Sequence, residues 1–161
     1  MNVFDYAMQM EKDGEAYYRD LAHKCHQDGL NRILILLADD EVGHYNAFKQ
    51  LKDEMSPDIR GTAILGKAKT IFAEMKDQLE DFNVNISEID LYKKAIEVEI
   101  KSAAFYKEKA EEIDNKDAKA ILLKIAQDEE RHRYLLENMV EFLSRPITWI
   151  ENAEFVHLDE Y

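Results

Sequence analysis

Apolar and small residues recur at steps of three and four along most of the chain, which is the spacing that places them on one face of a helix. The pattern predicts four long helices, at about 2–25, 30–55, 88–113 and 118–143. Gly29 is the expected break between the first two helices, and residues 115–117 form the expected turn between the last two. The fold class that follows is all-α.

The segments between and after these helices are less regular. Pro57 ends the second pattern, and a weaker pattern at 63–82 predicts a shorter helix within a long crossover. Ser87 to Asp90 has the form of a capping signal for the third long helix. We expect one four-helix bundle domain over residues 1–161, with hairpins at about 2–55 and 88–143, the crossover at 56–87 and an apolar-studded tail at 144–161.

The two hairpins repeat each other at one constant offset of 88 residues, from Glu11 to Glu99. A single offset without a gap links both helices of each half and implies a pseudo-twofold axis between the hairpins. The matched residues are Ala7, Glu11, Ala16, Tyr18 and Ala22 with Ala95, Glu99, Ala104, Tyr106 and Ala110, and Ile33, Leu34, Ala38, Asp40, Glu41 and His44 with Ile121, Leu122, Ala126, Asp128, Glu129 and His132.

Composition narrows the class of function. The net charge is −13, which disfavours a nucleic-acid partner. The sequence shows no apolar run of membrane-spanning length and no signal-peptide pattern, so we expect no membrane partner. The single cysteine, Cys25, excludes an intrachain disulfide framework and a cysteine-based metal module, and a cytoplasmic setting is the default expectation.

The repeated charged residues lie on the apolar faces of the predicted helices. Glu41 and His44 fall on the stripe that contains Leu37 and Phe48, and their repeat partners fall on the corresponding stripe of the fourth helix. Buried carboxylates need a compensating positive charge, and two divalent cations would balance four of them. Glutamate and imidazole together suit iron, manganese or zinc. The candidate ligands are Glu11, Glu41, His44, Glu99, Glu129 and His132.

A single Glu-x-x-His pattern is common on a solvated helix face, but here two copies occur in register, each with a glutamate on the preceding helix. This set resembles the ferritin-like di-iron carboxylate superfamily, and within it the short members of the rubrerythrin group. The resemblance implies two iron ions bridged by Glu41 and Glu129, with Glu11 and Glu99 as terminal ligands and one histidine on each ion. It also implies that Asp40 orients His132 and that Asp128 orients His44, unless both are surface aspartates.

Tyr18 and Tyr106 lie two turns beyond Glu11 and Glu99, close enough for each phenol to hydrogen-bond a ligand carboxylate across the core, with plain core packing as the alternative. Rubrerythrins proper carry an additional glutamate where this chain has Ser102, and a rubredoxin domain whose paired cysteines this sequence lacks. Glu15 is an alternative extra ligand, whereas the spacing of His23, Cys25 and His26 fits no standard metal site.

The resemblance implies a redox enzyme that reduces hydrogen peroxide or dioxygen in oxidative-stress defence. Its electrons would come from an external carrier such as rubredoxin, and the protein would form a homodimer, with or without exchange of hairpins. Two alternatives stay open from the sequence. One is iron binding, oxidation or storage without catalytic turnover, and the other is oxygenation of an organic substrate.

Overall fold

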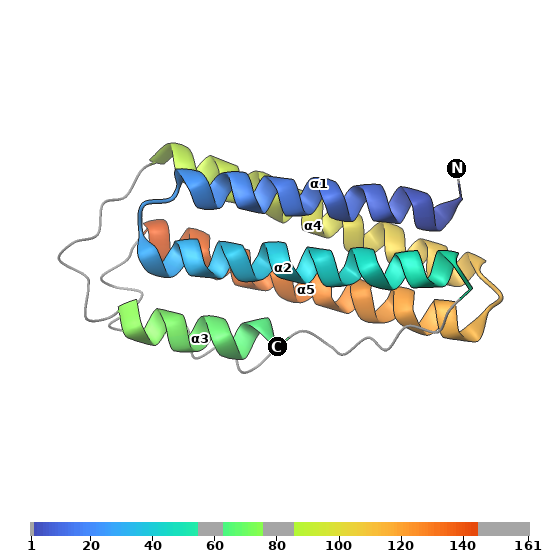
Figure 1. Ribbon diagram of the computed structural model, residues 1–161. Coiled ribbons are helices and arrows are strands. Elements are labelled where there is room, and N and C mark those ends of the chain that lie inside the picture. Colours follow the sequence, from blue (N-terminus) through green and yellow to red (C-terminus); the bar gives the residue numbers. More distant parts are fainter. Residues whose placement is uncertain (1, 55–62, 76–85, 145–161) are drawn as a thin grey trace.

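The computed structural model describes residues 2–54, 63–75 and 86–144, and within these ranges it contains five α-helices and no strand (Figure 1). The all-α prediction is confirmed. The helices are α1 (Val3–Lys24), α2 (Asp28–Lys52), α3 (Ile64–Met75), α4 (Ile86–Glu112) and α5 (Lys116–Ser144).

The four long helices form a bundle of two antiparallel hairpins, one of α1 and α2 and one of α4 and α5 (Figure 1). The end of α2 and the start of α4 lie at opposite ends of the bundle, so the connection between them spans its length (Figure 1). Helix α3 belongs to this connection and packs outside the bundle against α2 and α5. This is the ferritin-like arrangement that the sequence predicted, built here by one chain.

Polar side chains cap the starts of three helices. The side-chain oxygen of Asn2 accepts a hydrogen bond from the Asp5 amide at 2.9 Å, and Asn115 accepts one from the Ala118 amide at 3.0 Å. Gln27 caps α2 in the same way, through the Leu30 amide at 2.8 Å. These contacts satisfy amide groups that a helix start otherwise leaves without partners.

Several predicted boundaries change. Gly29 is not a break, because α2 begins at Asp28 and a Cβ at position 29 would lie 2.5 Å from Met75 Sδ. The glycine instead allows α3 to pack closely on α2. Ser87 is not an N-cap either, because α4 already begins at Ile86. The predicted crossover helix is present as α3 over Ile64–Met75, and its predicted continuation to residue 82 and the tail beyond Ser144 lie outside the described residues.

Two apolar clusters fill the bundle, one on each side of a polar layer. One cluster contains Leu34, Tyr92 and Leu136, and the other contains Ala7, Phe48 and Ile125. The residues between them along each long helix include the repeated glutamates and histidines. Among the described residues, no helix combines the length and the apolar character needed to cross a membrane.

Candidate metal centre

Each of the four long helices places one glutamate in the polar layer. Glu11 comes from α1, Glu41 from α2, Glu99 from α4 and Glu129 from α5, and each is at most 3% exposed. One turn after Glu41 and Glu129, α2 and α5 contribute His44 and His132, which are equally buried. Each residue lies on an otherwise apolar helix face, so the burial of that face carries it into the core. The structure thus brings together all six candidate ligands.

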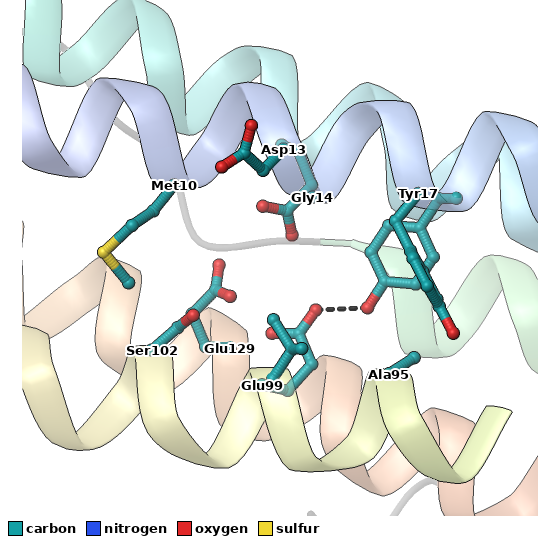
Figure 2. A pocket seen from close by; sticks show the side chains of 11 residues that line it. Met10, Asp13, Gly14, Tyr17, Ala95, Glu99, Ser102 and Glu129 are labelled. Carbon is teal, nitrogen blue, oxygen red and sulfur yellow. Dashed lines mark hydrogen bonds between the residues drawn. The ribbon is translucent and has the colours of Figure 1, made fainter. Parts of the chain in front are cut away.

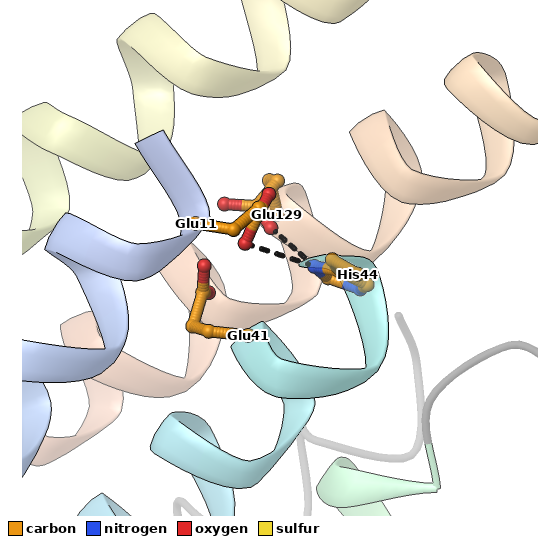
Figure 3. A group of neighbouring side chains, drawn as sticks. All are labelled: Glu11, Glu41, His44 and Glu129. Atoms are coloured by element: carbon orange, nitrogen blue, oxygen red, sulfur yellow. Dashed lines mark ion pairs between the residues drawn. The ribbon is translucent and has the colours of Figure 1, made fainter. Parts of the chain in front are cut away.

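The six residues form two overlapping groups. In each group, ligand atoms of four residues lie within 4.8 Å of one another. The first group contains Glu11, His44 and both glutamates Glu41 and Glu129 (Figure 3), and the second replaces Glu11 and His44 with Glu99 and His132. Glu41 and Glu129 belong to both groups, so the two groups share their two central carboxylates.

Each imidazole is held by an aspartate from the other hairpin. His44 Nε2 lies 3.0 Å from Asp128 Oδ2, and His132 Nε2 lies 2.8 Å from Asp40 Oδ2. These contacts pair the residues that the family resemblance implied. In both contacts the other ring nitrogen, Nδ1, faces the glutamates. The distance from His44 Nδ1 to Glu129 Oε1 is 2.9 Å. A carboxylate on the far nitrogen is the usual way to orient a metal-binding histidine.

Each terminal glutamate accepts a hydrogen bond from a tyrosine of the other hairpin. The Tyr106 hydroxyl donates to Glu11 Oε1 at 2.7 Å, and the Tyr18 hydroxyl donates to Glu99 Oε1. Burial, together with the neighbouring carboxylates, raises the pKa of both phenols well above the usual value. Both hydroxyls therefore keep their protons and remain donors. The contacts are equivalent under the 88-residue repeat, since Tyr18 matches Tyr106 and Glu11 matches Glu99.

Four buried polar atoms of this layer form no well-aligned hydrogen bond, although His44 Nδ1 lies within ion-pair distance of Glu129 Oε1 and of Glu11 Oε2. They are Glu11 Oε2, His44 Nδ1, Glu99 Oε2 and Glu129 Oε1. A buried polar atom without a well-formed hydrogen bond is costly, and all four of these atoms belong to residues of the two ligand groups. Carboxylate oxygens and imidazole nitrogens are the donors that iron, manganese and zinc accept. The residues present therefore fit a pair of divalent cations.

The electrostatics of the layer lead to the same conclusion. Burial, and then the negative charge of Glu11, raises the pKa of Glu41 and of Glu129 well above the usual range. Burial disfavours the charged imidazole, but the carboxylates outweigh it and hold the pKa of His44 well above its usual value. The metal-free layer thus retains protons that cations would replace.

Sequence analysis missed Gly14, one turn from Glu11. A Cβ at this position would lie 2.9 Å from Glu41 Oε2, so the glycine makes room for a central carboxylate. The signal was present in the repeat, because Gly14 matches Ser102 and both residues are small. Glu15 does not join the centre but pairs with Arg19 at 2.7 Å. Among the described residues, His23, Cys25 and His26 belong to neither metal-binding group.

The fold and this layer define a class, the ferritin-like helical bundles with a buried carboxylate and imidazole centre. The family model for rubrerythrin matches residues 2–140, which is most of the chain. The chain therefore belongs to the rubrerythrin family. Comparisons with curated proteins and with solved structures gave no match, so the family model carries this assignment.

Proposed function

We propose that the chain is a di-iron redox enzyme that reduces hydrogen peroxide, or dioxygen, with electrons from an external carrier. The observation that carries the proposal is the pair of overlapping ligand groups that share Glu41 and Glu129. Two ions at these groups would supply two electrons, which is the number that cleavage of one peroxide bond requires. Membership of the rubrerythrin family supports the same reading.

The protein side chains have separate roles in this proposal. Glu41 and Glu129 would be shared by the two ions, and Glu11 with His44 and Glu99 with His132 would complete the two sites. The tyrosine hydroxyls hold the terminal carboxylates in place, and Asp40 and Asp128 fix the orientation of the imidazoles. A ferrous pair supplies reducing electrons and Lewis acidity at this centre.

The overall reaction balances with one peroxide. Hydrogen peroxide takes up two electrons and two protons, its O–O bond breaks, and two water molecules leave. The apolar clusters cover the layer on both sides along the bundle axis and limit the access of water from those directions. In this proposal the electrons come from a one-electron carrier of the rubredoxin type, which is the donor that membership of the rubrerythrin family suggests.

The metal centre has a direct test. Elemental analysis of the iron-reconstituted protein should find two ions per chain. Glu41→Ala combined with Glu129→Ala should abolish binding, because both shared ligands are lost. Glu97→Ala is the matched control, since Glu97 is exposed on α4 two residues before Glu99. Unchanged metal content in the double variant would contradict the assignment.

The redox reaction is tested by mixing the diferrous protein rapidly with hydrogen peroxide and, separately, with dioxygen. We expect one of these two oxidants to oxidise the diferrous protein rapidly. Multiple turnovers should follow once reduced rubredoxin is supplied. Oxidation that stops after one turnover with either oxidant would instead identify a protein that binds or stores iron. Homodimer formation and a cytoplasmic location stay predictions, and light scattering of the purified protein tests the first.

A further inference from the structure

A pocket opens between α1 and α4 and leads to the carboxylate layer (Figure 2). Its volume is about 300 Å³. Met10 and Tyr17 on α1 line it (Figure 2), together with Val98 on α4, which is exposed at the surface. Its inner residues include Glu99 and Glu129 of the carboxylate layer. The pocket is thus a path from solvent to the candidate metal centre.

The pocket is larger than hydrogen peroxide needs. A water molecule takes about 30 Å³ of liquid volume, so a molecule of two oxygens takes roughly 60 Å³, about a fifth of this space. A volume of about 300 Å³ lies at the lower end of the range for sites that bind small organic molecules. Gly14 and Ser102 help to create the space, because a larger side chain at either position would enter the pocket.

The lining also restricts the charge of a ligand. Among the described residues that line the pocket, the charged ones are all acidic: Asp13 near the surface, and Glu41, Glu99 and Glu129 at the inner end. An anion would meet repulsion from Asp13 before it reached the centre. Met10, Ala95 and Val98 offer apolar contact on the way. The matching ligand is uncharged, with a small apolar body and an oxygen-bearing end.

We propose that this pocket binds the organic part of an alkyl or aryl hydroperoxide, with the peroxide end directed to the carboxylate layer. The inference rests on the proposed function and extends its substrate from hydrogen peroxide to organic hydroperoxides. The hydroperoxide takes up two electrons and two protons, its O–O bond breaks, and an alcohol and a water molecule leave. The electrons come from the same one-electron carrier.

Binding is tested without turnover on the full chain loaded with zinc, which does not change oxidation state. The probe is 2-phenyl-2-propanol, the alcohol formed from cumene hydroperoxide, and its affinity is measured by calorimetry or ligand-observed NMR. Val98→Trp should weaken binding about tenfold or more, because the indole occupies space that the phenyl ring needs. Ile100→Trp is the matched control, since Val98 and Ile100 are 51% and 50% exposed on the same helix.

Turnover by the iron-loaded enzyme separates this inference from the proposed function. In Val98→Trp, kcat/KM for cumene hydroperoxide should fall about tenfold while that for hydrogen peroxide changes little. Absence of probe binding to the wild-type protein, or equal effects of Val98→Trp and Ile100→Trp, would overturn the pocket assignment. Probe binding that depends on Val98, without turnover of any peroxide, would uphold the pocket and refute the proposed function.

Discussion

The hydrogen bond from Tyr106 to Glu11 gives the sharpest prediction about the centre. Both residues are at most 1% exposed, and the hydroxyl lies 2.7 Å from Glu11 Oε1. Tyr106→Phe removes this donor without removing the ring. Glu11 Oε2 makes only a 3.5 Å contact with His44 Nδ1, so the carboxylate would lose its one short hydrogen bond. A hydrogen bond to a charged group contributes about 1.5–3 kcal/mol.

The loss of metal affinity should affect one of the two metal sites and not both. Glu11 belongs only to the group that contains His44, so Tyr106→Phe should weaken that site about 10–100-fold, or about 1.4–2.7 kcal/mol. Tyr18→Phe should weaken the other site, through Glu99. Stepwise zinc titration against a competing chelator resolves the two affinities. Each single variant should therefore show one wild-type and one weakened binding step.

Tyr92→Phe is the control for this titration. Tyr92 is also buried on α4, but its hydroxyl contacts the Cys25 thiol at 4.0 Å instead of a carboxylate. Sulfur is a weak acceptor, so the expected loss of stability is below about 1 kcal/mol. Metal affinity should not change. Wild-type affinity at both sites in Tyr106→Phe, or equal weakening in Tyr92→Phe, would refute the reasoning.

Three further predictions concern stability and assembly of the centre. The raised pKa values of Glu41, Glu129 and His44 mean that the metal-free fold binds more protons than the unfolded chain. The Tm of the metal-free protein should therefore fall as pH rises, from about 4.5 through the two glutamates and from about 6.5 through His44. Zinc loading should reverse the trend, and parallel thermal melts of the two forms would show it. Gly14→Ala should lower zinc affinity, because the added Cβ crowds the Glu41 side chain. Gly43→Ala is its control, because a Cβ at position 43 meets nothing within 4 Å. This variant should raise the free energy of unfolding by about 0.5–1 kcal/mol, measured by denaturant titration. Asp128→Asn should weaken zinc binding about 10–100-fold with little change in the helical circular dichroism, and a collapse of helicity would contradict an orienting role.

The long helices and the buried polar layer could be predicted because they depend on local periodicity and on the repeat. Each candidate ligand lies on an apolar stripe, and burial of that stripe determines where the ligand goes. Two halves in one register then require their glutamates and histidines to meet at the same level of the bundle. The tyrosine and aspartate contacts follow from the same register, since each joins one hairpin to the other.

Features that depend on the distance between elements could not be predicted. Gly29 has the form of a helix break in the sequence, but its role is to admit Met75 from α3, a contact across 46 positions of the chain. Gly14 likewise matters only because the Glu41 side chain approaches it. The pocket depends on how far α1 stands from α4, which no spacing within either helix determines.

The 88-residue repeat also bears on how the centre assembles. Each hairpin carries three of the six candidate ligands, and each ligand group takes one glutamate from the opposite hairpin. Two separate hairpins would have to meet by diffusion, and the fraction assembled would fall on dilution. Joining them in one chain replaces that encounter with a fixed effective concentration. The centre can thus form even when the protein is scarce.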